Sequence, residues 1–397
     1  MGALELDTNP EWLIWARKTA KYRIETVASK IKESPETIKN WEKTGKIEYN
    51  NLLKLAEYYQ RPTSVFFSKI KPKYDKETPD FRTFGGGVKN NISPSVAFEI
   101  RNAKFKRRNL LNIKEECPEF STNEFKFKNI YYENEDGIPE IIRSKLKISG
   151  ADIRTKKLKY WIEKLESMGI LVFEFYDIDP DEMRGYAIYY DNLPIIGINH
   201  RESDNPKKFT LFHELTHLLL KKEGISNLYG YELGKKDEIV CNKIAAEILV
   251  PSNLFKTIII EYEYEKFRKK DVEKLAKEFK VSKDVIIRKA LNLNFISKQE
   301  YELRKEEFNT YLKYKKSGKR KIKGLSSEKN EKKLSLEEKY QREATKALTM
   351  NGHYYTKKLF EAYDNDLISD LDLSDSLNVS LDIVRKLYEN ISLEESI

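Results

Sequence analysis

Apolar residues recur at three- and four-residue spacing in the first 70 residues, and this spacing is typical of one face of a helix. The pattern runs through WLIWARKTA, ETVASKIK and NNLLKLAEYY. Ser34 is suited to cap a further helix, with Pro35 at its first position and Gly45 after its end. The pattern predicts a small all-helical domain over residues 1–70.

Prolines and three consecutive glycines then mark a linker over residues 71–94. Helical spacing returns from Ser95 and gives way to three β-rich runs, ILVFEFY, GYAIYY and LPIIGIN. Two long helices follow, one through HELTHLLL and one from Asp237 to Val250. We therefore expect a domain over residues 95–260 with a small sheet of three or more strands.

The remainder reads as a helical region over 261–310, a charged linker over 311–345 and a C-terminal helical segment over 346–397. The linker holds six basic residues and no acidic residue between Lys315 and Lys323. Such a run is usually solvated, although it could also contact a nucleic-acid backbone. The predicted fold class is α+β and mostly helical.

Composition narrows the class of protein. Charged residues make up 35% and hydrophobic residues 40%, with a net charge of +9. Cys117 and Cys241 cannot build a disulfide framework or a zinc cage of thiolates. No signal peptide is evident, and no apolar run approaches the roughly 20 residues of a membrane span. We expect a cytoplasmic protein without a membrane partner.

The most specific chemical signal is the sequence HELTH. His213 and His217 are four residues apart, so both imidazoles lie on one face of a helix and can bind one ion. Glu214 follows the first histidine and can act as the base that takes a proton from water. Zn²⁺ is the usual metal for such a set. The alternative is a pair of packed core histidines.

A catalytic zinc site needs a third protein ligand. The candidates are the downstream carboxylates Glu232, Asp237, Glu238 and Glu247. We favour Glu238, which stands near the start of the helix DEIVCNKIAAEILVP and shares a face with Asn242. Glu247 is the second choice. The alternative role for Glu238 is an acidic residue favoured by the helix dipole.

The strand block, the FTL before HELTH and the later E-x-x-C-N-x-x-A-A segment together resemble the ImmA/IrrE family of metallopeptidases. The resemblance implies a gluzincin-type zinc endopeptidase with ligands His213, His217 and Glu238 and base Glu214. Thr216 and Cys241 depart from the usual glycine and alanine. A thiolate at Cys241 could compete for metal, but a buried cysteine usually acts as a small hydrophobic residue.

The resemblance also implies substrates of one kind, namely DNA-binding repressors cleaved during stress or activation of phage and other mobile elements. We expect LPIIGIN to lie along the cleft as an edge strand that pairs with the substrate backbone. His200 follows it and could stabilise an oxyanion, although a surface loop histidine is the plainer interpretation.

The segment ASKIKESPETIKNWEKTG resembles the helix-turn-helix of lambda-repressor-like (XRE) proteins. Ala28 would allow the two helices to approach closely, and Ile31, Ile38 and Trp41 would form the small core. The recognition helix would present the DNA-binding side chains Ser34, Glu36, Thr37, Lys39 and Asn40.

Double-stranded DNA is therefore an expected partner. The electrostatic support is weak, because residues 1–70 carry a net charge of +3 and Glu36 repels phosphate. A module that docks onto another protein's helix-turn-helix is the alternative, and a homodimer is compatible with either.

One spacing occurs three times along the chain, at Ala28-Ile31-Ser34-Ile38, Ala276-Phe279-Ser282-Ile286 and Ser374-Leu377-Ser380-Val384. It predicts three helical hairpins. For the last two we favour an ordinary tight corner between helices over DNA binding.

Two functions from different classes remain. The first is a zinc endopeptidase with a DNA-binding head that cleaves or controls a transcription repressor. The second is a DNA-binding regulator, for example a toxin–antitoxin partner, with a structural or sensory zinc site and no turnover. Glu214 favours the enzyme, because a structural site needs no base.

Overall fold

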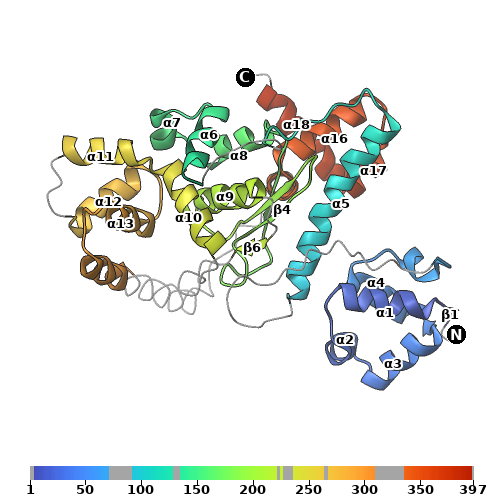
Figure 1. Cartoon of the computed structure of the whole chain (residues 1–397). Helices are drawn as coiled ribbons and strands as arrows, with labels where there is room; N and C mark the ends of the chain where they lie inside the picture. The colour runs from blue at the N-terminus through green and yellow to red at the C-terminus, as the bar shows by residue number, and fades with distance from the viewer. Residues whose placement is uncertain are drawn as a thin grey trace. The chain divides into compact units, whose positions relative to one another are not determined.

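The computed structural model describes residues 4–70, 92–127, 135–220, 224–226, 236–262, 267–308 and 335–395. These residues form two compact units, which meet in sequence between Phe105 and Lys106. Helices dominate both units, as expected for a mostly helical α+β fold, and each unit has one small sheet (Figure 1). Within the described ranges, no helix combines the length and apolar character that crossing a membrane requires.

Residues 4–70 of the first unit form four helices, a pair of short strands and a 3₁₀ turn. Its elements are β1 (Glu5–Asp7), α1 (Pro10–Thr19), α2 (Ile24–Ile31), α3 (Pro35–Thr44), β2 (Lys46–Glu48), α4 (Tyr49–Tyr59) and the 3₁₀ turn η1 (Thr63–Phe67). The strands pair antiparallel, with Leu6 opposite Ile47. These strands were not predicted, because three residues are too few to show the alternation of apolar and polar residues that is typical of a strand.

The α2–α3 hairpin follows the sequence signals closely. The Ser34 hydroxyl accepts a hydrogen bond from the backbone N–H of Thr37 at 3.0 Å, and Pro35 opens α3. Gly45 ends α3 with φ +75°, and a Cβ there would lie 2.2 Å from the Thr8 carbonyl oxygen. The predicted core is confirmed, because Ile31, Ile38 and Trp41 are all buried, and Ala28 is buried in the same cluster.

Helix α5 (Pro94–Glu116) spans the boundary between the units. The second unit then contains, in chain order, η2 (Glu135–Gly137), α6 (Ile138–Lys145), α7 (Gly150–Thr155), α8 (Leu158–Glu166), β3 (Leu171–Phe175), β4 (Gly185–Ile188), β5 (Ile195–Asn199), α9 (Asp204–Leu219), β6 (Gly224–Ser226), α10 (Lys236–Leu249), α11 (Ser252–Glu261), α12 (Lys269–Glu278), α13 (Lys283–Asn292), α15 (Leu336–Asn351), α16 (His353–Asp364), α17 (Asp370–Leu377) and α18 (Leu381–Glu395).

The sheet of the second unit has the order β3-β5-β4-β6. Strands β3 and β5 are parallel, whereas β4 pairs antiparallel with both β5 and β6. The expectation that LPIIGIN forms an edge strand is therefore wrong. Strand β5 lies inside the sheet, and all five of its residues are buried. The three predicted β-rich runs do supply strands, and β6 adds a fourth.

Helix α9 packs against the sheet and is buried on nearly all sides from Lys207 to Leu219. The Trp161 ring of α8 packs edge-on against the Phe212 ring, with 5.4 Å between the ring centroids. Helix α10 packs along α9 and adds Ile244, Ile248 and Leu249 to the same core. The helix that carries HELTH is thus held rigidly between the sheet, α8 and α10.

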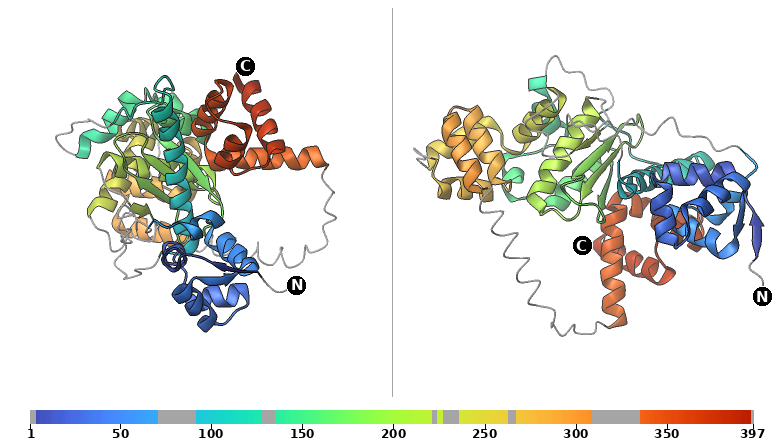
Figure 2. Two further views of the ribbon diagram at one scale, coloured as in Figure 1. Left: turned by 90° about the vertical axis from the view of Figure 1, so that its right-hand side faces the viewer. Right: turned by 90° about the horizontal axis from the view of Figure 1, so that it is seen from below.

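Helices α15 to α18 form a bundle (Figure 2) whose first two helices pack against β3. Helix α15 begins at Leu336, inside the stretch assigned to a charged linker, because Ser335 and Glu338 form a capping box. Gly352, between α15 and α16, lies so close to β3 that a Cβ would be 2.3 Å from the Val172 carbonyl oxygen. The basic run from Lys315 to Lys323 lies outside the described residues.

The three sequence repeats are indeed helical hairpins with one shared turn. In each hairpin, the backbone carbonyl of the first residue of the repeat accepts a hydrogen bond from the backbone N–H five residues later. The residue four positions after the first has a positive φ. The pairs are Ala28 with Glu33, Ala276 with Val281 and Ser374 with Val379, and the left-handed residues are Lys32, Lys280 and Asn378. The same bond follows Ala56 at the end of α4, so it marks a common helix terminus rather than a function.

Candidate metal centre

Three side chains from two helices converge beside the sheet. His213 and His217, one turn apart on α9, bring their Nε2 atoms within 3.1 Å of each other. Glu238, in the first turn of α10, places Oε2 3.2 Å from Nε2 of His213 and Oε1 3.2 Å from Nε2 of His217. Within the described residues, their potential ligand atoms all lie within 4.8 Å of one another.

These spacings fit a zinc ion. Ligand distances of about 2.0–2.1 Å at tetrahedral angles place two ligand atoms roughly 3.3 Å apart. The observed separations of 3.1 and 3.2 Å agree with that value. Two imidazole nitrogens and a carboxylate oxygen are also a donor set that zinc prefers. The residues present therefore fit the metal that the sequence motif predicts.

His213 is oriented by a neighbour that the sequence analysis did not assign a role. Its Nδ1 lies 3.0 Å from Oδ1 of Asn242, one turn after Glu238 on α10. Because an amide oxygen only accepts, Nδ1 donates this hydrogen bond, and Nε2 faces Glu238 and His217. The spacing of Asn242 from Glu238 was the available signal for this contact.

Glu214 is fully buried at the same place on α9. Its carboxylate lies against strand β4, since a Cβ added to Gly185 would be 2.8 Å from Oε1 of Glu214 and 2.5 Å from Cγ2 of Thr210. A side chain at position 185 would therefore displace the carboxylate. Glycine at this position of β4 was not recognised from the sequence as part of the site.

The charge distribution favours an ionised carboxylate between the histidines. Burial opposes ionisation of Glu238, but hydrogen bonds from His213 and His217 lower its pKa to about 2. Burial likewise opposes charge on His217, yet its contacts with Cys241 and Glu238 raise its pKa well above 6.5. Burial raises the pKa of the Cys241 thiol, although His217 lowers it. Cys241 is thus a neutral buried thiol at pH 7.

The sheet, helices α9 and α10 and the α12–α13 hairpin lie in a stretch of the chain that is similar to a known family. Residues 165–291 match the family model of the IrrE N-terminal-like domain. The match supports a metallopeptidase function for this part of the chain. Among curated proteins, none matches the chain. The α2–α3 hairpin lies outside the matched residues.

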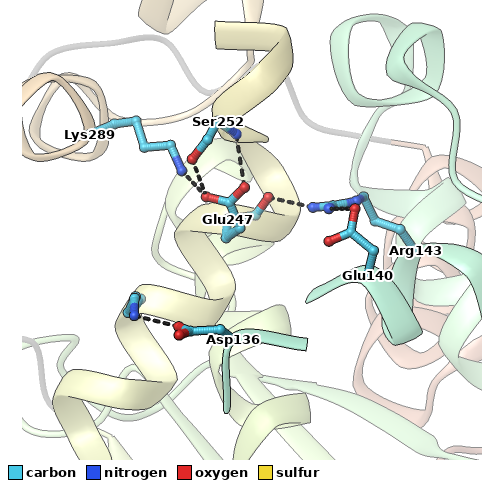
Figure 3. A network of polar contacts seen from close by, with 7 residues as sticks. Asp136, Glu140, Arg143, Glu247, Ser252 and Lys289 are labelled. Carbon is cyan, nitrogen blue, oxygen red and sulfur yellow. Dashed lines mark hydrogen bonds and ion pairs between the residues drawn. The ribbon is translucent and has the colours of Figure 1, made fainter. Parts of the chain in front are cut away.

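Glu247, the second choice for the third ligand, makes a different set of contacts. Its carboxylate accepts hydrogen bonds from the backbone N–H and the hydroxyl of Ser252, at 2.8 and 2.7 Å, and pairs with Lys289 of α13 (Figure 3). Arg143 of α6 donates to the Glu247 carbonyl at 2.7 Å. Glu247 therefore joins α6, α10, α11 and α13, away from the histidine pair.

A second buried lysine attaches the α12–α13 hairpin to the domain. Lys208 of α9 donates to the carbonyl of Phe279, at the end of α12, at 3.2 Å. Burial lowers the pKa of Lys208 to about 8, with Lys280 adding to the effect. Lys208 and Lys289 thus connect the hairpin to α9 and α10, the two helices that carry the candidate metal ligands.

His200, expected as an oxyanion stabiliser, lies in a different set of contacts. Its Nδ1 is 2.8 Å from Oε2 of Glu174, which also accepts from Lys207 at 2.7 Å. Its imidazole ring stacks on the ring of Tyr176, with 3.9 Å between the ring centroids. The role proposed for His200 stays a prediction. Of the other candidates, Asp237 lies beside Glu238, and Glu232 lies outside the described residues.

The side chains expected to contact DNA lie along one face of α3. Glu36, Lys39 and Asn40 are exposed, and Thr37 is half-buried. The hydroxyl of Ser34 caps the helix by accepting a hydrogen bond from the backbone N–H of Thr37. Nζ of Lys39 lies 3.9 Å from Oε1 of Glu36. The face is open to a partner, but Glu36 reduces its positive charge.

The other two hairpins differ from the first at the equivalent position. Eleven residues after the first small residue stand Lys39, Ile287 and Arg385. Ile287 is buried at 1% exposure, so α13 has no open face there. Arg385 is exposed, but its hairpin carries four nearby acidic residues: Asp370, Asp372, Asp375 and Asp382. Burial and charge therefore leave α3 as the best suited of the three helices for DNA.

Proposed function

We propose that the chain is a zinc-dependent endopeptidase. The observation that carries the proposal is the convergence of His213, His217 and Glu238 beside the fully buried Glu214. In this proposal the first three side chains hold the metal and Glu214 is the base. The match to the IrrE N-terminal-like domain supports the same class of activity.

When bound, zinc would supply a Lewis acid that polarises water and the scissile carbonyl. Glu214 takes the proton from the attacking water and returns it to the leaving amine. Asn242 holds His213 in the tautomer that directs Nε2 inward. Gly185 leaves room for the Glu214 carboxylate beneath β4.

We further propose that the α2–α3 hairpin binds double-stranded DNA and that the substrate is a helix-turn-helix repressor. The hairpin supports this through its capped second helix and its exposed Lys39 and Asn40. A DNA-binding head would bring the peptidase to the operators where repressors lie.

A DNA-binding regulator with a sensory or structural zinc site is the second candidate. It would use the same three ligands but would need no base. The complete burial of an ionisable side chain at position 214 is costly unless the residue has a function there, so the enzyme is favoured.

The test compares the wild-type protein with Glu214→Gln. Both should bind one zinc per chain, and the wild type alone should cleave a helix-turn-helix repressor from a panel of candidates. If both bind zinc and neither cleaves any of them, the regulator is the better account. Cleavage by Glu214→Gln at the wild-type rate would contradict the role of Glu214 as the base.

A further inference from the structure

The base and the two histidines of the proposed catalytic centre are buried. Glu214 exposes none of its surface, and His213 and His217 expose 4% and 2%. A general base must come within hydrogen-bond distance of the water and the peptide bond that it serves. Part of the chain must therefore move before a substrate can reach Glu214.

Strand β4 is the sheet element closest to the base. Position 185 of β4 lies directly over the Glu214 carboxylate, as the 2.8 Å approach of its added Cβ shows. One edge of β4 is paired with β5. An extended peptide on its other edge would run about 4.8 Å from β4, within reach of the base. Extended peptides commonly bind proteins by adding a strand in this way.

That second edge of β4 is occupied by β6. The pairs are Gly185 with Ser226, Tyr186 with Ile225 and Ala187 with Gly224, all antiparallel. Strand β6 lies in sequence between α9 and α10, the helices that carry the proposed ligands, and Figure 1 shows it beside β4. Each backbone hydrogen bond contributes only about 0.5–1.5 kcal/mol net, so a strand of three residues can be displaced.

We propose that β6 occupies the substrate-binding edge of β4 and that an extended peptide replaces it there. This inference rests on the proposed peptidase function. It replaces the expectation that β5 receives the substrate, since both edges of β5 are paired within the sheet. It also explains a buried catalytic centre without requiring the sheet core to open.

The test uses the full chain carrying Ala187→Cys and Gly224→Cys, which stand opposite each other on β4 and β6. Cys117→Ser removes the half-buried thiol from the background. The probe is a peptide hydroxamate, whose chelating group binds zinc and whose backbone can pair with a strand. We expect the oxidised, locked protein to bind the probe at least tenfold more weakly than the reduced protein, with equal zinc content.

The matched control is Gly224→Cys alone in the same background, for which oxidation should change nothing. Equal binding of the probe by the locked and reduced forms would overturn the inference while leaving the peptidase proposal intact. Failure of the two cysteines to cross-link under oxidant would overturn it as well, because the β4–β6 register would then be wrong. Zinc-loaded wild-type protein that binds no probe would instead contradict the proposed function itself.

Discussion

Asn242 illustrates how one residue outside the proposed ligand set supports it. Its Oδ1 accepts from Nδ1 of His213 at 3.0 Å, which fixes the ring and its tautomer. We predict that Asn242→Ala weakens zinc binding by roughly 10–100-fold. Competition with a chromophoric chelator measures the affinity.

The neighbouring residue provides the control for that experiment. Lys243 is exposed and pairs with Asp136 at 2.6 Å, so Lys243→Ala should leave zinc affinity unchanged. Equal losses in the two variants would show that α10 is merely destabilised and would contradict a specific role for Asn242.

The buried carboxyl group of Glu166 should make the free energy of unfolding depend on pH. It is buried at 4% exposure at the end of α8 and accepts from the backbone N–H of Tyr354, at the start of α16, at 3.2 Å. Burial raises its pKa to about 8, partly offset by the Tyr354 hydrogen bond. The folded state therefore holds a proton that the unfolded state releases above its ordinary pKa, 4.5. Stability should fall as the pH rises from 4.5 to 8.

Replacing Glu166 by glutamine should remove this part of the pH dependence. Urea denaturation of the wild type and Glu166→Gln at pH 6 and pH 9 measures the difference, and the variant should lose less stability between the two. Glu261→Gln, which changes an exposed glutamate at the end of α11, is the control and should behave as the wild type. Parallel losses in all three proteins would rule out Glu166 as the titrating group.

The proposed ligand set shows how far single residues could be inferred. The pair His213 and His217 follows from helix geometry alone. Glu238 and Glu247 stand nine residues apart, which is about two and a half helical turns, so they lie on opposite faces of α10. The sequence could rank them, but only the packing of α10 on α9 shows which face meets the histidines. The contact between Asn242 and His213 could likewise be inferred only from the packing of α10 on α9.

At the scale of elements, Gly352 connects α15 to α16 in a conformation that favours glycine. Its φ is +75° and its ψ 148°, and a Cβ would meet the Val172 carbonyl oxygen at 2.3 Å. We predict that Gly352→Ala destabilises the protein by about 1–3 kcal/mol or more, since both strain and steric overlap oppose it. Chemical denaturation gives the value.

Gly137 offers a matched control, because a Cβ there meets no atom within 4 Å. Gly137→Ala should change stability by less than about 0.5 kcal/mol. If the two variants are equally stable, the close contact between the α15–α16 turn and β3 is absent in solution.

The sheet shows which elements sequence patterns can and cannot place. The runs that form β3, β4 and β5 were found because each contains at least four apolar or aromatic residues. The prediction that β5 lies at an edge of the sheet was wrong. Its continuous apolar run, LPIIGI, indicates burial on both faces and suits an interior strand. Strand β6, with three residues, has too short a pattern to be recognised.

At the scale of the whole molecule, the repeated hairpin provides an internal comparison for DNA binding. Lys39 and Arg385 occupy equivalent positions on α3 and α18, and both are exposed. We predict that Lys39→Glu weakens binding to a mixed-sequence DNA duplex, whereas Arg385→Glu has little effect because its hairpin is acidic. Fluorescence anisotropy at several salt concentrations measures both, and the salt dependence should decrease for Lys39→Glu alone.

Equal weakening by the two substitutions would contradict a DNA-binding role specific to the first hairpin. No duplex binding by the wild-type protein at low salt would favour a hairpin that docks onto a protein partner instead. In either case the proposed metal centre, which belongs to the other unit, should bind zinc as in the wild type.

The central claim is that His213, His217 and Glu238 together bind zinc. X-ray absorption at the zinc edge of the purified wild-type protein tests it most directly. We predict a first shell of nitrogen and oxygen at about 2.0–2.1 Å, with two imidazoles and no sulfur. A sulfur ligand at about 2.3 Å would show that Cys241 binds the metal and would contradict this ligand set.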